Sequence, residues 1–163
     1  MAVLPILQWP DTRLSVRCMP VAPGGGARKL AEDMLETMYA AEGRGLAAPQ
    51  VGITERLFVM DEGWKIGRPS PVILTNPVIA WVSSELATGP EVCLSIPGVT
   101  AHVSRSTALR LRWIAVDGTP REELLTGFAA ICAQHEMDHL DGIVTLDHLS
   151  AAERTRAEAA LAA

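Results

Sequence analysis

The sequence lacks an apolar run long enough to cross a bilayer. Its longest uncharged stretch, residues 69–84, contains three prolines, and it falls short of the roughly 20 apolar residues that a transmembrane helix needs. The first ten residues have no basic region, and two prolines interrupt them, so they are not typical of a signal peptide. We therefore expect a cytoplasmic protein with no membrane partner.

Cysteine and positive charge are also scarce. The three cysteines, Cys18, Cys93 and Cys132, are odd in number and widely spaced, which favours free thiols over a disulfide framework. Lys and Arg number 14 against 19 Asp and Glu, giving a net charge of -5, and this argues against a dedicated nucleic-acid-binding protein. The length and the 48% of hydrophobic residues predict one globular domain over residues 1–163.

Hydrophobic spacing predicts the order of the elements. Helical periodicity covers residues 27–42, with Gly43 placed to end the helix, and it returns over residues 127–140. A capping-box pattern at Ser150 opens a last helix. Between the helices, the sequence predicts strands at residues 57–60, 72–75, 78–82 and 107–116, the last followed by an Asp117-Gly118 hairpin turn. One helix, several strands and two further helices favour an α+β fold.

The segment that carries the clearest chemistry is His135-Glu136-Met137-Asp138-His139. Residues four apart lie on one face of a helix, so the two imidazoles can bind one metal ion while Glu136 reaches a water on that ion. A divalent ion lowers the pKa of such a water toward about 7. An exposed polar helix turn is the alternative, but the apolar residues just before the segment favour burial.

A catalytic metal site of this kind needs a third protein ligand, and the residues alone leave it open. Cys132 precedes His135 by one helical turn, but helical side chains lean toward the N-terminus, so a core position is the better interpretation for it. The remaining candidates are Cys93, His102, His148, Asp138, Asp141 and Asp147.

A second notable segment is Gly43-Arg-Gly-Leu-Ala-Ala-Pro-Gln50. Its small residues permit close approach of a ligand or another chain segment, and Pro49 disfavours a regular central strand. Considered alone, a helix cap and connector is the favoured interpretation of this segment. The Gln50 side chain is also able to offer an amide N–H to a developing oxyanion.

Taken together, three segments make the chain resemble the peptide deformylases. That family carries the motifs Gly-x-Gly-Leu-Ala-Ala-x-Gln, Glu-Gly-Cys-Leu-Ser and Gln-His-Glu-x-Asp-His, found here at residues 43–50, 91–95 and 134–139. The resemblance implies antiparallel sheets around a central helix. It also implies the metal ligands Cys93, His135 and His139, with Fe²⁺ as the usual ion and Zn²⁺, Ni²⁺ or Co²⁺ able to take its place.

The same resemblance implies the reaction. The family removes the formyl group from formyl-methionine at the start of nascent polypeptides and releases formate. By analogy, Glu136 takes a proton from the attacking water and passes it to the leaving amine. The Gln50 side-chain amide and the Leu94 backbone N–H would stabilise the oxyanion.

The resemblance further assigns a pocket for the methionine side chain. Phe128, Ile131 and Cys132 stand at its lining positions, while Arg44 and Gly45 would form its rim and contact the peptide backbone. Some relatives reach the ribosome through a long basic C-terminal helix. Here the last helix carries only Arg154 and Arg156, so at most a weak ribosome contact is expected. Arg105 matches a recurrent family arginine, for which we expect a structural ion pair.

Position 92 departs from the motif, because Val92 stands where the family has glycine. If that glycine had a positive φ, valine would be strained there, and its methyl groups would narrow the groove for substrate. A slowed or non-catalytic homologue that binds metal or peptide N-termini is therefore one alternative. A metallopeptidase that cleaves internal amides by the same chemistry is another.

Overall fold

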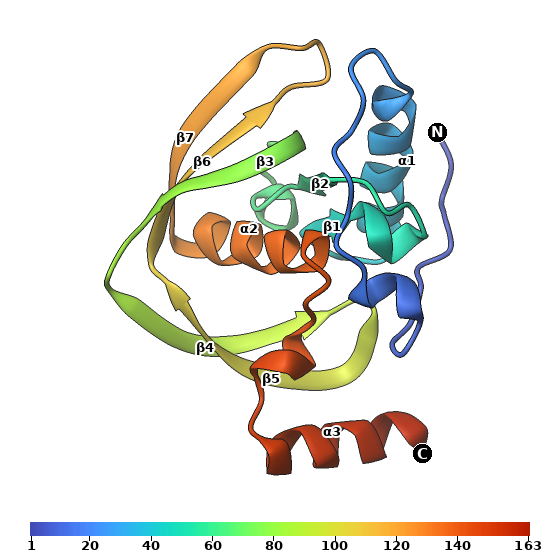
Figure 1. The fold of residues 1–163 in the computed structure, drawn as a ribbon, viewed down its shortest axis with the longest axis vertical. Coiled ribbons are helices and arrows are strands. Elements are labelled where there is room, and N and C mark those ends of the chain that lie inside the picture. Colours follow the sequence, from blue (N-terminus) through green and yellow to red (C-terminus); the bar gives the residue numbers. More distant parts are fainter.

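The computed structural model describes residues 1–163 as an α+β fold built of two antiparallel sheets and three helices (Figure 1). The larger sheet has the strand order β1-β2-β3-β6-β7. Its strands are Gly45–Ala47, Leu57–Met60, Val72–Val82, Ala108–Ile114 and Pro120–Thr126. The smaller sheet pairs β4 (Leu86–Cys93) with β5 (Ile96–Ser106).

Helix α2 (Gly127–Leu140) lies between the two sheets (Figure 1). Its apolar side packs against the inner face of the larger sheet, where alternation along β6 points Leu109, Leu111 and Trp113 inward. Burying these side chains is the main favourable contribution to folding. The site described below is therefore carried by a helix at the centre of the fold.

The other two helices cover outer surfaces. Helix α1 (Ala27–Ala40) packs Met34 and Met38 against β1 and β2, while α3 (Ala151–Ala162) lies against β5 (Figure 1). No residue of α3 is buried. None of the helices is long and apolar enough to pass through a membrane.

Two predicted boundaries are corrected by the structure. Helix α1 ends at Ala40, and the left-handed residue after it is Glu42, with φ 56°, whereas Gly43 was expected to terminate the helix. The two strands predicted at residues 72–75 and 78–82 form one strand, β3. An irregularity at Asn76, with φ 48°, separates its halves, and this explains why the sequence pattern is interrupted there.

The helices predicted at residues 127–140 and after Ser150 are present, as are the strands predicted at residues 57–60 and 107–116. The sequence pattern did not predict β1, β7 or the two strands of the smaller sheet, β4 and β5. Gly118, with φ 88°, completes the turn between β6 and β7, a conformation that glycine adopts without cost. The Ser150 side chain accepts a hydrogen bond from the backbone N–H of Glu153 and caps α3. Pro49 lies in a 3₁₀ turn over Ala48–Val51 that follows the short strand β1, so the segment is not a central strand.

Candidate metal centre and its pocket

Helix α2 brings three polar side chains into the interior. Glu136 and His139 are only 4% and 1% exposed, and His135 is partly buried beside them. Because His135 and His139 are one turn apart, their ring centroids lie within 5.0 Å. The helix therefore presents two imidazoles and one carboxyl group to the same buried space.

Cys93 completes the group from a distant part of the chain. It is the last residue of β4 and is buried, and its Sγ lies 3.4 Å from Nε2 of His139. The possible ligand atoms of Cys93, His135 and His139 all lie within 4.8 Å of one another. These three residues form the cluster that the family resemblance implied.

The other third-ligand candidates lie outside this cluster. The His148 imidazole hydrogen-bonds to Asp138 Oδ2 at 2.8 Å. Asp141 pairs with Arg56, and Asp147 pairs with Arg154. His102 lines a shallow groove between β5 and α3.

A buried ion-pair network orients His135. Its Nδ1 donates to Glu91 Oε1 at 2.9 Å, which leaves Nε2 as the nitrogen free to bind an ion. Arg105 donates to both oxygens of Glu91, at 2.8 and 2.9 Å, and to Asp138 at 2.7 Å. Burial opposes the charge of Glu91, but hydrogen bonds from Arg105 and His135 outweigh it and lower its pKa to about 2. The expected structural ion pair of Arg105 is therefore present, and it acts on the site through Glu91.

Glu136 occupies an unusual environment for a carboxyl group. Burial raises its pKa to about 7, so the group exchanges a proton near neutral pH. Its Oε2 is buried and has no hydrogen-bond partner in the protein. A buried acceptor of this kind costs free energy unless a ligand or water completes it.

Backbone packing holds Glu136 in this place. A Cβ atom added to Gly45 would lie 2.6 Å from Glu136 Oε1 and 2.8 Å from Cys132 Sγ. Only glycine allows β1 to pass this close to α2. The small residues of the segment 43–50 therefore serve close approach between chain segments, in addition to connecting a helix to a strand.

Gln50 lies on the other side of the cluster. Its Nε2 donates to Ser95 Oγ at 3.1 Å and lies 3.7 Å from Cys93 Sγ. Its Oε1 accepts a hydrogen bond from the backbone N–H of Ala47 at 2.9 Å. These contacts hold the amide next to the thiol, with its donor group facing the cluster.

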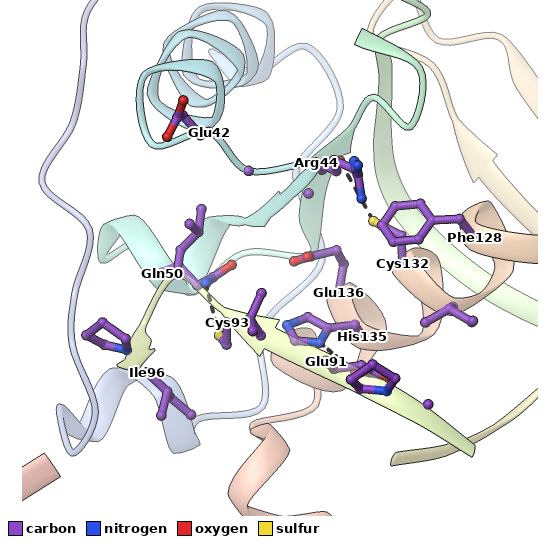
Figure 2. Close-up of a pocket in the computed structure, with 18 of the residues that line it drawn as sticks. Glu42, Arg44, Gln50, Glu91, Cys93, Ile96, Phe128, Cys132, His135 and Glu136 are labelled. Atoms are coloured by element: carbon purple, nitrogen blue, oxygen red, sulfur yellow. Dashed lines mark hydrogen bonds and ion pairs between the residues drawn. The ribbon is translucent and has the colours of Figure 1, made fainter. Parts of the chain in front are cut away.

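A cavity of about 420 Å³ opens in front of these residues (Figure 2). Cys93, His135, Glu136 and Gln50 line it, and it has room for a side chain and part of a peptide. Every other predicted site residue except His139 also lines this cavity, namely Arg44, Gly45, Val92, Leu94, Phe128, Ile131 and Cys132.

The structure removes the proposed backbone strain at Val92. Its φ is not in the left-handed region, and it pairs with Thr100 in the β4–β5 ladder. The residue is 74% exposed and borders the cavity. Valine therefore fits the backbone here, and only its side chain distinguishes this position from the family motif.

The donor set of the cluster fits a divalent transition metal. One thiolate and two imidazoles are ligands that iron and zinc accept. Burial lowers the pKa of His139 well below its usual range, so its ring is neutral, as a metal ligand must be. Three protein ligands leave a coordination position open, which is typical of catalytic rather than structural sites.

Sequence reasoning gave no role to three residues of this site. Glu91 orients His135, Ser95 holds Gln50, and Lys65 lines the cavity. The role of Glu91 could have been predicted in principle. Residues two apart on a strand point to the same face, and Glu91 stands two residues before Cys93. Lys65 comes from a 3₁₀ turn after β2, for which the sequence carries no corresponding signal.

Comparison with known proteins gives a consistent result. The polypeptide deformylase family profile matches residues 3–155. A peptide deformylase of Alkalilimnicola ehrlichii is 47% identical over 157 residues, covering 96% of this chain and 87% of the relative. The crystal structure of a peptide deformylase from Legionella pneumophila superimposes with a TM-score of 0.93 at 35% identity, covering 99% of this chain and 94% of that one. A peptide deformylase from Ehrlichia chaffeensis in complex with actinonin also gives 0.93, at 37% identity, covering 99% of this chain and 96% of that one.

Proposed function

The chain belongs to the peptide deformylase family of metal-dependent hydrolases, and we propose how its residues remove the formyl group from formyl-methionine at the N-terminus of nascent polypeptides. The observation that carries the proposal is the convergence of Cys93, His135 and His139 within 4.8 Å, beside the buried carboxyl of Glu136. Nothing in the structure favours a non-catalytic homologue.

We assign Cys93, His135 and His139 as the ligands of one divalent ion. Fe²⁺ is the ion we propose, because the family resemblance implies it. Zn²⁺, Ni²⁺ and Co²⁺ are substitutes, because a thiolate and two imidazoles suit all four ions. Such an ion supplies Lewis acidity and makes water a nucleophile at neutral pH.

Glu136 is the proton carrier in this proposal. It accepts the proton that water loses as its oxygen bonds to the formyl carbon. It then delivers that proton to the amine nitrogen as the C–N bond breaks, so that formate and a free N-terminus leave. Its place next to the ligand cluster and its unpartnered Oε2 support this role.

Gln50 and Leu94 stabilise the negative charge that develops on the formyl oxygen. The amide of Gln50 is held 3.7 Å from Cys93 Sγ, and the backbone N–H of Leu94 directly follows that cysteine in the sequence. Removing one such donor costs about 100- to 1000-fold in rate.

The methionine side chain occupies the apolar part of the cavity. Phe128, Ile131 and Cys132 line it from α2, and Arg44 and Gly45 form its rim on the side of β1. The side chain of Val92 borders the groove along which the rest of the peptide would extend.

The partners follow from this substrate. Formylated nascent chains occur where proteins are synthesised, so we propose a cytoplasmic site of action. Any ribosome contact through α3 is weak, because Arg154 pairs with Asp147 and Glu158 and leaves Arg156 as the only other basic residue of that helix.

The decisive experiment measures formate release from a formyl-Met peptide. The protein is purified anaerobically and loaded with Fe²⁺, Zn²⁺, Ni²⁺ or Co²⁺ in separate samples, because an Fe²⁺–thiolate centre is open to oxidation. We expect formate release with at least one ion and a loss of about 100- to 10,000-fold in Glu136→Ala. Absence of formate with all four ions would contradict the function.

Two further outcomes separate the alternatives. Full activity in Glu136→Ala would contradict the role of Glu136 while leaving the function intact. Cleavage of an unformylated peptide at an internal amide would support the metallopeptidase alternative, and we expect none.

A further inference from the structure

The motif Gly-x-Gly-Leu-Ala-Ala-x-Gln does not specify the residue between its first two glycines. In this chain that residue is Arg44. It borders the cavity, and its guanidinium carbon lies 4.9 Å from the centroid of the Phe128 ring. Figure 2 shows the two side chains side by side on the same edge of the cavity. A cation over an aromatic face is attracted by the ring quadrupole, so Phe128 holds the Arg44 guanidinium at this edge of the cavity.

Arg44 has no acidic partner. None of the ion pairs of the structure includes it, and its Nε is buried without any hydrogen-bond partner. Lys65 also lines the cavity, and it too forms no ion pair with an acidic residue. An arginine with unused donors at the edge of a cavity is suited to bind a carboxylate.

The acidic residues of the cavity do not cancel this charge. Glu91 is engaged by Arg105, and Glu136 lies at the catalytic centre. Glu42 is the remaining acid of the lining, and in Figure 2 it stands at the end of α1, apart from Arg44. The whole chain has a net charge of -5, but the rim of the cavity at Arg44 and Lys65 is locally positive.

We propose that Arg44, held by Phe128, is a specificity-determining residue that selects substrates with an acidic side chain within the two residues after the formyl-methionine. This rests on the proposed function, which places the methionine against Phe128. Successive residues of an extended peptide are about 3.3 Å apart, so the next two side chains fall within reach of the guanidinium at the rim. A lysine at the same positions is repelled.

The test compares formyl-Met-X-Ala and formyl-Met-Ala-X peptides with X as Asp, Ala or Lys. We expect kcat/KM to favour Asp over Lys by about tenfold in at least one series, through KM, with a smaller ratio in high salt. In Arg44→Gln the ratio falls close to one. Arg44→Lys keeps the charge but lacks the planar fork, so it retains only part of the preference.

Arg28→Gln is the matched control, because it removes the same charge from an exposed residue of α1 that does not line the cavity. It should keep the wild-type ratio. A wild-type enzyme without acidic preference, or an unchanged ratio in Arg44→Gln, would overturn the proposal. An equal fall in Arg28→Gln would overturn it too, because overall charge would then explain the preference.

A binding measurement separates this proposal from the function itself. Affinities of the unformylated product peptides Met-Asp-Ala and Met-Lys-Ala are measured by calorimetry on the metal-loaded wild type and Arg44→Gln. Tighter binding of Met-Asp-Ala that is lost in Arg44→Gln supports the selection even if no formate is released. Equal affinities for the two peptides in an enzyme that releases formate overturn the selection alone.

Discussion

Arg105 donates to both carboxylate oxygens of Glu91, at 2.8 and 2.9 Å, and both side chains are less than a tenth exposed. Glu91 in turn accepts from Nδ1 of His135. The arginine therefore acts on a proposed metal ligand through one intervening carboxylate, without touching the ligand itself. This relationship makes stability and metal affinity depend on the same residue.

Replacing Arg105 by methionine leaves the charge of Glu91 buried and uncompensated. We expect Arg105→Met to lower the free energy of unfolding by about 3–5 kcal/mol and the metal affinity by about 10- to 100-fold. Denaturant unfolding and metal titration measure the two effects. Arg112→Met is the control, because its ion pair with Glu122 is exposed and should contribute less than about 1 kcal/mol. Similar losses in both variants would contradict the positioning role.

Replacing Cys93 and replacing Cys132 should have different effects on the metal content of the protein. Cys93→Ala removes a proposed ligand, so we expect the purified protein to lose its bound divalent ion and its activity together. Cys132→Ala should retain the ion, since Cys132 lies outside the ligand cluster although it is buried nearby. Elemental analysis of both variants checks this. Full metal content in Cys93→Ala would refute the ligand assignment.

Gly45→Ala should impair the site by steric contact alone. The added methyl group would stand 2.6 Å from Glu136 Oε1, so either the carboxyl or β1 must move. We expect a fall in kcat of about 100-fold, as a displacement near 1 Å at a reacting group produces. Gly26→Ala adds the same methyl group where no atom lies within 4 Å, and its kcat should match the wild type. An active Gly45→Ala enzyme would show that Glu136 tolerates displacement.

Val92→Gly restores the family motif. Because the backbone of Val92 is not in the left-handed region, glycine relieves no strain, and we expect the change to act on KM rather than on kcat. Glycine within a strand also lowers the free energy of unfolding by about 0.5–1 kcal/mol. Steady-state kinetics with a formyl-Met peptide check this. A large rise in kcat in Val92→Gly would instead support the alternative that the wild-type protein is a slowed deformylase homologue.

Tyr39 joins α1 to the turn after β2. Its hydroxyl donates to the buried carboxylate of Asp61 at 2.7 Å, and we expect Tyr39→Phe to lower the free energy of unfolding by about 1–3 kcal/mol. Burial and then the bond to Asp61 raise the pKa of Tyr39. The phenol therefore stays neutral in the folded state when the unfolded chain begins to ionise.

The sign of this shift sets the pH dependence. A raised pKa contributes stability that is complete below about pH 10, the ordinary pKa of tyrosine, and that is lost as the pH rises further. The difference in unfolding free energy between wild type and Tyr39→Phe should therefore be constant from pH 7 to 9 and shrink above pH 10. A difference that grows with pH would contradict the assignment.

The amino-acid sequence alone determined the local parts of this site. Helical spacing placed His135, Glu136 and His139 on one buried turn, and turn and capping residues marked the hairpin at Gly118 and the start of α3. These features depend on neighbours within a few residues, where backbone preferences and side-chain period act directly. The residues by themselves left the third metal ligand open, and only the family motif pointed to Cys93.

Tertiary structure decided what lies between distant segments. It brought Cys93 to His139 across 46 residues, joined Arg105 to Glu91, continued β3 through Asn76, and set Arg44 over Phe128. These contacts depend on how the two sheets close around α2, and the free energy of that closure is summed over the whole core. No local pattern encodes such a sum, so the pairing of remote side chains emerges only when the chain is folded.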